Sequence, residues 1–194
     1  MEKTKSIKGT RTERNLMASF AGECQAHMRY AYYAKQARKE GYEQIAAIFD
    51  ETSAQEMMHA KRMFKWLEGG KVEVTATYLA GVIGTTSENL LEASQGERSE
   101  WLEDYPLFAM VAEEEGFTAI AAMYRRIAEA ERGHEDRFLA LRKNLLEDAV
   151  FHKTEEVVWQ CRKCGYLHVG NEAPFTCPSC LHPQAYFEVR KENY

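Results

Sequence analysis

Apolar and aromatic side chains recur every three or four residues over most of the chain, which is the spacing of amphipathic helices. The first such segment follows Thr10, which has a glutamate three residues later as in a capping box, and it continues to Gly41. A second segment runs from about Glu43 to Leu67 and ends at a pair of glycines. Together the two segments predict an αα-hairpin.

The helical period is interrupted after this hairpin. Residues 71–84 lack it and are rich in β-branched side chains, so we expect an extended crossover there. A second capping box at Thr85 begins a third helix that reaches about Asp104. We expect a break before Pro106 restarts the helix, and a fourth helix over about 117–146.

The two halves of this region resemble each other. The sequence IAAIF over Ile45–Phe49 is matched by IAAMY over Ile120–Tyr124, at an offset of 75. Near the start of each half the offset is 74, as in the pair Gly22 and Gly96, so a single inserted residue reconciles the two registers. Two related hairpins joined by a long crossover predict a mainly α protein, a four-helix bundle of the ferritin-like kind.

In this register each half has a glutamate in its first helix and a Glu-x-x-His motif in its second. Residues three apart share one helix face, and apolar residues flank each motif, so we expect these side chains to point into the bundle. The six residues are Glu23, Glu56, His59, Glu97, Glu131 and His134.

Four ionised glutamates buried together would repel each other strongly unless protons or cations neutralise them. Two divalent ions would balance the charge, and a donor set of carboxylates with one imidazole per metal suits iron or manganese. A non-haem di-iron site is the usual outcome of this pattern, with Glu56 and Glu131 as the expected bridges. One isolated motif would be read as a solvated helix surface, but its duplication in register favours the metal site.

Three further side chains are candidates for roles beside the metals. Glu100 lies one turn beyond Glu97. Two divalent ions already balance the charge of the four glutamates, so a fifth carboxylate is a candidate for a protonatable group. The alternative is an exposed glutamate. Tyr30 and Tyr105 are candidates to hydrogen-bond ligand carboxylates, although core packing would explain both phenols nearly as well.

Composition narrows the classes of partner. The chain has 30 acidic and 25 basic residues in 194, mixed along the sequence, which disfavours nucleic acid as a partner. No stretch approaches the roughly 18 apolar residues of a membrane span, and residues 1–14 are too polar for a signal peptide. We therefore expect a cytoplasmic protein without a membrane partner.

The C-terminal tail differs from the rest, because three of the four prolines fall between residues 174 and 183. We expect a bundle over residues 1–148 and a linker with a small metal-bound β/loop domain over 149–194. Two Cys-x-x-Cys motifs predict a tetrahedral site for iron or zinc, without which so short a tail would be unstable. Its ligands are Cys161, Cys164, Cys177 and Cys180.

Aromatic side chains of the tail are expected to surround this metal, and a fifth cysteine lies outside both sites. Trp159, Tyr166, Phe175 and Phe187 would shield an iron from water, although the packing of a zinc ribbon would use them as well. Cys24 adjoins Glu23, and we interpret it as a small buried side chain.

Nearly the whole chain resembles the rubrerythrin family, in which a di-iron bundle precedes a rubredoxin-like tail. The matching motifs are Phe20-Ala21-Gly22-Glu23, Glu56-x-x-His59, Gly96-Glu97 with Glu100, Glu131-x-x-His134, Cys161-x-x-Cys164-Gly165-Tyr166 and Cys177-Pro178-x-Cys180. Leu181 departs from the pattern, since a free-standing rubredoxin has glycine after its second motif.

The resemblance implies a peroxidase that reduces hydrogen peroxide to water and protects against oxidative stress. It implies two non-haem irons in the bundle, one of which exchanges His59 for Glu100 on oxidation, and one iron bound by the four cysteines. It further implies a homodimer or higher oligomer, and electrons from a rubredoxin or an NAD(P)H-dependent rubredoxin reductase. A ferritin-like ferroxidase is the alternative, but iron storage needs no attached electron carrier.

Overall fold

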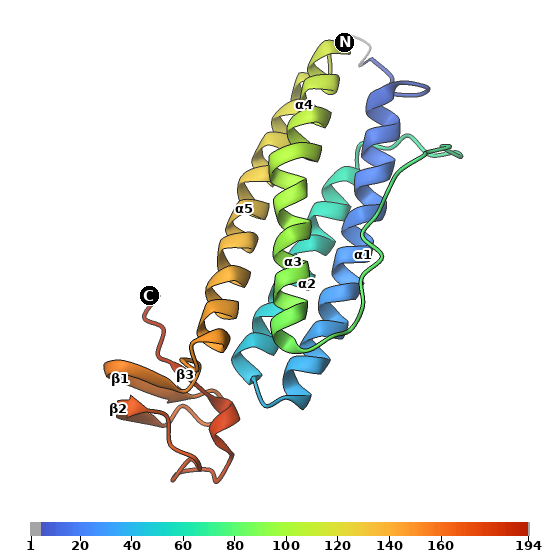
Figure 1. Cartoon of the computed structure of the whole chain (residues 1–194). Coiled ribbons are helices and arrows are strands. Elements are labelled where there is room, and N and C mark those ends of the chain that lie inside the picture. The colour runs from blue at the N-terminus through green and yellow to red at the C-terminus, as the bar shows by residue number, and fades with distance from the viewer. Residues whose placement is uncertain (1–4, 194) are drawn as a thin grey trace.

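The computed structural model describes residues 5–193 as an elongated helical bundle with a small sheet at one end (Figure 1). This confirms the expected fold class. The helices are α1 (Arg11–Lys39), α2 (Glu43–Phe64), α3 (Thr86–Ser99), α4 (Tyr105–Glu114) and α5 (Thr118–Leu146), with a π-helical turn, η1 (Glu100–Asp104), between α3 and α4. No helix in the described range is both long and apolar enough to cross a bilayer.

The helix starts follow the predicted caps, with one difference. The Thr10 hydroxyl accepts from the Glu13 amide at 3.1 Å, but the Glu13 carboxylate accepts from Gly9. The reciprocal capping box forms fully at the start of α3, between Thr85 and Glu88. The α2 helix ends at Phe64, three residues before the predicted end.

The predicted break before Pro106 is wrong. Instead, α3 continues into α4 through η1, where the Tyr105 amide bonds to the Glu100 carbonyl, five residues back. A π-turn of this kind holds one residue more than an α-turn. The insertion that shifts the repeat offset from 74 to 75 therefore lies here, and the wider turn also accommodates the proline.

The crossover between the two hairpins passes against both α1 and α3, in the extended form predicted (Figure 1). The Tyr78 hydroxyl donates to the Ala18 carbonyl at 3.1 Å. A Cβ on Gly22 would lie 3.8 Å from the Tyr78 ring, and one on Gly96 would lie 3.9 Å from Leu79. The paired glycines of the repeat thus let the crossover approach both helices closely.

Two apolar clusters fill the bundle on either side of a polar layer. One, at the α1–α2 turn, includes Tyr33, Phe49 and Phe138, and the other, toward the opposite end, includes Leu16 and Tyr124. Water is excluded from both clusters, so the polar layer between them is closed off along the bundle axis.

The tail forms a three-stranded antiparallel sheet of β1 (His152–Cys161), β2 (Leu167–Glu172) and β3 (Phe187–Val189), in the order β2-β1-β3. A short 3₁₀ helix, η2 (Gln184–Tyr186), precedes β3. Trp159 and Phe187 are buried as expected, whereas Phe175 is 75% exposed, so its predicted shielding role is wrong.

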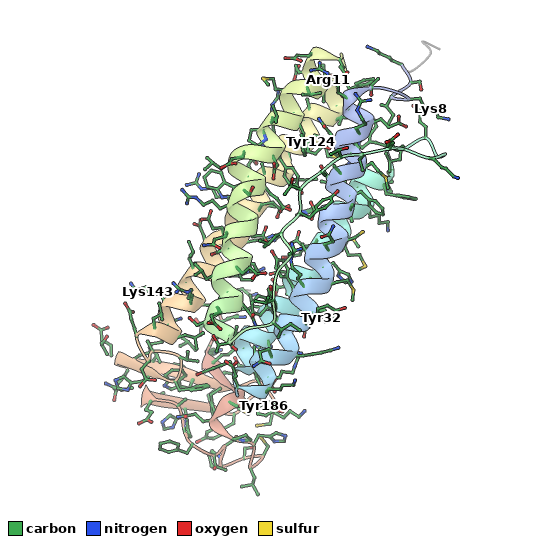
Figure 2. The ribbon with its side chains drawn as sticks, turned by 45° about the vertical axis from the view of Figure 1, so that its right-hand side comes forward. Lys8, Arg11, Tyr32, Tyr124, Lys143 and Tyr186 are labelled. Atoms are coloured by element: carbon green, nitrogen blue, oxygen red, sulfur yellow. The ribbon has the colours of Figure 1, made fainter. Side chains whose placement is uncertain are left out.

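The tail packs on the end of the bundle at the α1–α2 turn. The rings of Tyr42 and Phe151 are stacked with centroids 6.1 Å apart, and Figure 2 shows Tyr186 next to this end of the bundle. The domain boundary at residue 148 falls between α5 and β1 and stays a prediction.

Candidate metal centre

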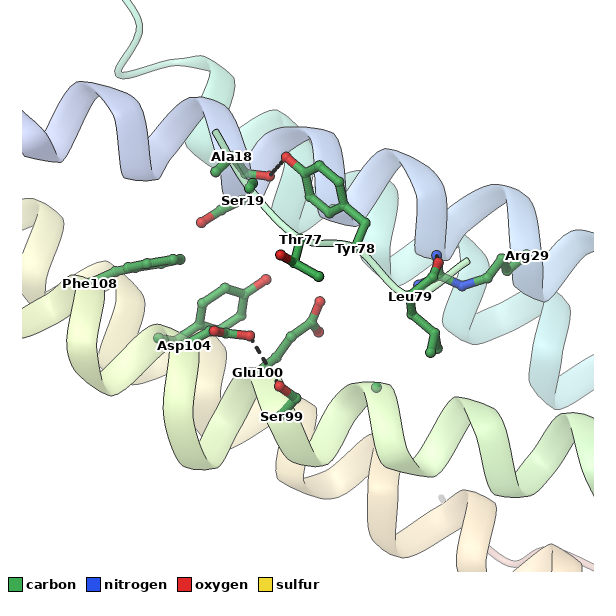
Figure 3. A pocket seen from close by; sticks show the side chains of 14 residues that line it. Ala18, Ser19, Arg29, Thr77, Tyr78, Leu79, Ser99, Glu100, Asp104 and Phe108 are labelled. Carbon is green, nitrogen blue, oxygen red and sulfur yellow. Dashed lines mark hydrogen bonds between the residues drawn. The ribbon is translucent and has the colours of Figure 1, made fainter. Parts of the chain in front are cut away.

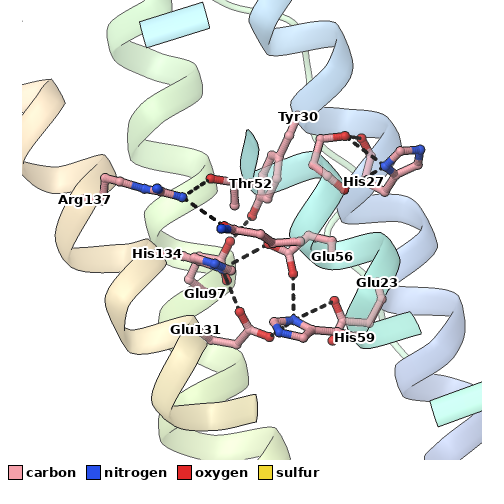
Figure 4. Close-up of polar contacts among 12 residues, drawn as sticks. Glu23, His27, Tyr30, Thr52, Glu56, His59, Glu97, Glu131, His134 and Arg137 are labelled. Carbon is pink, nitrogen blue, oxygen red and sulfur yellow. Dashed lines mark hydrogen bonds and ion pairs between the residues drawn. The ribbon is translucent and has the colours of Figure 1, made fainter. Parts of the chain in front are cut away.

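The polar layer contains the four glutamates of the repeat, one from each long helix. Glu23 lies on α1, Glu56 on α2, Glu97 on α3 and Glu131 on α5, and each is at most 1% exposed. Figure 4 shows them converging with His59 and His134 between the helices. The structure thus brings together all six side chains that the repeat singled out.

These side chains form two overlapping groups of donor atoms, each within 4.8 Å. One group is Glu23, Glu56, His59 and Glu131, and the other is Glu56, Glu97, Glu131 and His134. Glu56 and Glu131 belong to both groups, which is the geometry expected of bridging carboxylates.

The two histidines occupy equivalent positions across this layer. His59 Nδ1 lies 2.7 Å from Glu131 Oε1 and 3.1 Å from Glu56 Oε2. His134 Nδ1 lies 2.8 Å from Glu131 Oε2 and 3.1 Å from Glu56 Oε1. The internal repeat of the sequence therefore appears as a local two-fold arrangement of ligands.

Burial and mutual repulsion perturb the carboxylates of this layer. Burial, followed by the charges of nearby glutamates, raises the pKa of Glu23 and of Glu97 well above the ordinary value. Burial also acts to raise the pKa of Glu56, but hydrogen bonds from His134 and His59 outweigh it and lower that pKa to about 2.

The imidazoles shift in the complementary direction. Burial acts to lower the pKa of both histidines, but their bonds to Glu131 and Glu56 outweigh it. The pKa of His59 rises to about 10 and that of His134 to about 12. Without metal, protons therefore take up the charge that two cations would otherwise supply.

Orphaned polar atoms test whether cations fit here. Buried oxygens of all four glutamates, including both of Glu131, have no well-aligned hydrogen-bond donor within the described residues, and His134 Nδ1, although close to Glu131 and Glu56, has no well-aligned acceptor. Such atoms are costly to bury unless they bind a cation. Four carboxylates and two imidazoles around one centre match the donor preferences of a pair of iron ions.

Two phenols hold the outer carboxylates in a reciprocal arrangement. The Tyr30 hydroxyl of the first hairpin donates to Glu97 Oε1 at 2.6 Å, and that of Tyr105 in the second donates to Glu23. The two tyrosines are 75 residues apart, so they too are partners in the repeat. Both predicted carboxylate contacts are present, and each links one hairpin to the ligand of the other.

Glu100 borders the centre but belongs to neither donor group. It is partly exposed at the start of η1 and, in Figure 3, points into the space between α1 and α3. Burial, followed by the charges of Glu97 and Glu131, raises its pKa well above the ordinary value. This placement suits a group that holds a proton beside the metals.

Sequence reasoning missed the residue that ties η1 to α5. Glu135 is 5% exposed, accepts from the Trp101 indole at 2.5 Å and pairs with Arg98 at 3.2 Å. A second carboxylate directly after His134 was the available signal, but only the fold shows that its partner lies in the π-turn beside Glu100.

The four tail cysteines lie within 4.8 Å of one another as free thiols, in the arrangement predicted for a Cys₄ site. The Tyr166 amide bonds to Cys164 and lowers the pKa of that thiol to about 7. The His182 amide bonds to Cys180, and Leu181 adopts the left-handed φ of 60° that glycine would have. The turn thus keeps its amide–sulfur bond without the glycine.

Cys24 is exposed, so its interpretation as a buried side chain is wrong. Successive residues of a helix point about 100° apart, and the inward direction of Glu23 leaves its neighbour on the outside.

Comparisons with known proteins agree with both sites. The family model described as rubrerythrin matches residues 14–142, and that of the rubrerythrin rubredoxin-like domain matches 159–188. A rubrerythrin of Porphyromonas gingivalis is 55% identical to this chain, and the alignment covers 100% of this chain and 96% of the relative. A rubrerythrin of Nitratidesulfovibrio vulgaris is 49% identical, and the alignment covers 98% of this chain and 100% of the relative.

Among solved structures, mixed-valence nigerythrin aligns with a TM-score of 0.62 at 31% identity, covering 98% of this chain and 91% of its own. Symerythrin of Cyanophora paradoxa, at 24% identity and a TM-score of 0.62, shows the shared fold. The chain belongs to the rubrerythrin family of di-iron, ferritin-like oxidoreductases, with a di-iron site in its bundle and one iron in its Cys₄ tail.

Proposed function

We propose that the protein reduces hydrogen peroxide to water at the di-iron site, with electrons relayed through the Cys₄ iron. The observation that carries this proposal is the pair of buried donor groups sharing Glu56 and Glu131, beside a cavity of about 160 Å³ bordered by Glu100. The cavity is of the scale of a small oxidant, and its lining includes Glu100 and Tyr105, which border the metal ligands.

Each donor group would hold one iron, with Glu56 and Glu131 shared between them. Iron bound there supplies the two electrons that convert one peroxide molecule and two protons into two water molecules. Tyr30 and Tyr105 keep the outer carboxylates in position through their hydrogen bonds.

Glu100 is proposed as the source of one of the two protons, the other coming from solvent. Burial and the charges of Glu97 and Glu131 raise its pKa, which favours the protonated carboxyl, and it lines the cavity in which peroxide would lie. The family resemblance also implies that Glu100 replaces His59 as a ligand on oxidation. That exchange stays a prediction.

The electron path and the cellular role belong to the same proposal. A rubredoxin or an NAD(P)H-dependent rubredoxin reductase would reduce the tail iron, which passes electrons singly to the bundle in a homodimer or higher oligomer. The reaction would protect the cell from peroxide. A ferritin-like ferroxidase would oxidise iron at this site for storage in a protein shell, and it would leave the Cys₄ tail without a use.

Glu131→Ala tests the ligand set. It removes a carboxylate shared by both donor groups. We therefore expect the bundle to lose its iron while the tail keeps its iron. The protein should also lose donor-linked peroxide reduction. Metal analysis and peroxide consumption measure these effects. Glu129→Ala, an exposed change on the same helix, is the matched control. If Glu131→Ala keeps both bundle iron and turnover, the ligand set is wrong.

A further inference from the structure

The cavity beside Glu100 adjoins a larger groove, and the two spaces share part of their lining. The inner cavity is bordered by Glu100 and Tyr105, while the outer groove, of about 710 Å³, is bordered by Arg14 and Glu73. Five residues line both spaces and so form the neck between them: Ala18, Ala76, Thr77, Asp104 and Phe108.

One wall of this neck belongs to the helices and is firmly held. The Phe108 ring packs against Tyr124 with centroids 5.6 Å apart and against Tyr105 at 6.4 Å. Asp104 accepts from the Ser99 hydroxyl at 3.3 Å. These contacts fix the width of the neck on the side of η1 and α4.

The opposite wall is the crossover, which is fastened directly after Thr77. The Tyr78 hydroxyl donates to Ala18, and the Arg29 guanidinium donates to the Leu79 carbonyl at 3.3 Å. Thr77 itself is exposed and takes part in neither bond, and Figure 3 shows it facing Glu100 and Asp104. Its side chain can therefore be changed without removing a crossover anchor.

We propose that this neck is the route by which peroxide reaches the di-iron site, and that Thr77 sets the largest oxidant that passes. This rests on the proposed peroxidase function and adds to it a substrate class, hydrogen peroxide in preference to bulky alkyl hydroperoxides. The physical reason is steric, since the packed helix wall and the anchored crossover leave the neck little room to widen.

Thr77→Trp should plug the neck, with Ala80→Trp as the matched control, because Ala80 is exposed on the same crossover and lines neither space. Azide binding to the oxidised, iron-loaded protein is followed by stopped-flow absorbance. We expect Thr77→Trp to slow azide association about ten-fold or more, and Ala80→Trp to leave it within about two-fold, at unchanged iron content.

Thr77→Gly should open the neck. We expect the ratio of kcat/KM for cumene hydroperoxide to that for hydrogen peroxide to rise about ten-fold, the range that one or two carbon-sized steric changes produce in a pocket. Iron content and azide association should stay near those of the unmodified protein.

Failure of this inference is distinct from failure of the peroxidase function. Azide association that Thr77→Trp leaves unchanged would overturn the neck whatever the turnover, and would place access elsewhere, for instance beside the partly exposed His59. An unmodified, iron-loaded protein that reduces no peroxide would overturn the function, while slowed azide association in Thr77→Trp would still support the neck as the route to the metals.

Discussion

The buried carboxylates and imidazoles couple the stability of the protein to pH. Burial raises the folded-state pKa of Glu23, Glu97 and Glu100 above 4.5, so their contribution to stability is present below that pH and is lost as pH rises. The contribution of His59, with its pKa raised from 6.5 to about 10, is likewise complete below 6.5 and lost toward 10. Chelated, metal-free protein should therefore melt at a lower temperature at about pH 8 than at about pH 5.

Iron should reverse this trend, because it binds deprotonated ligands and so stabilises the fold more as pH rises. Differential scanning calorimetry of the metal-free and iron-loaded forms measures both slopes. Glu100→Gln removes one of the raised groups and should flatten the slope of the metal-free protein. Parallel slopes for the two forms would contradict the proposed origin of the effect.

Leu181, directly after the second Cys-x-x-Cys motif of the tail, has a strained backbone conformation. Its φ is 60° and its side chain is 76% exposed, so it combines a left-handed conformation with little packing. Leu181→Gly should stabilise the tail by about 1 kcal/mol, as relief of this conformation outweighs the added freedom of the unfolded chain. Denaturant unfolding followed by the absorbance of the Cys₄ iron measures the change. Leu167→Gly, in strand β2, should destabilise the tail instead.

At the scale of the element, η1 absorbs one inserted residue. Deleting the exposed Leu102 should convert the π-turn into an α-turn and keep the faces of α3 and α4 in register, so the bundle should still fold cooperatively. Deleting the exposed Gln95 from α3 should rotate the preceding residues by about 100° and move Leu90 and Ala93 out of the core. Thermal melts followed by circular dichroism compare the two deletion variants. Equal decreases in melting temperature would show that the insertion lies elsewhere.

At the scale of the whole molecule, the tail lies far from the metal centre of its own chain. Its Ala185 side chain is 3.8 Å from a Cβ built at Gly41, just beyond the end of α1. Glu23 lies 16 residues before Lys39, the last residue of α1, which is about 24 Å at 1.5 Å per residue. We therefore expect electrons to pass between subunits. Cys177→Ser chains mixed with Glu131→Ala chains, under conditions that exchange subunits, should regain donor-linked peroxide reduction that neither has alone. Heterodimers that stay inactive with their remaining metal sites loaded would favour a path within one chain.

The sequence by itself determined the elements and the donor residues. Helical periodicity and the pair Thr85 and Glu88 mark α3, and the 74–75 offset places one glutamate and one Glu-x-x-His motif in each half. This works because helix faces and turn ligands follow from local spacing, and the two cysteine motifs are local in the same way.

Only the tertiary structure decided how these elements meet. An offset reveals an inserted residue but not the backbone that absorbs it, so Pro106 suggested a break where η1 forms. Several features of the site join residues that are distant in sequence. They are the hydrogen bonds of Tyr30 and Tyr105 to the opposite hairpin, the bond of Trp101 to Glu135, and the neck at Thr77. Such contacts depend on how the crossover and the helices pack, and packing is a property of the folded chain as a whole, not of any local spacing.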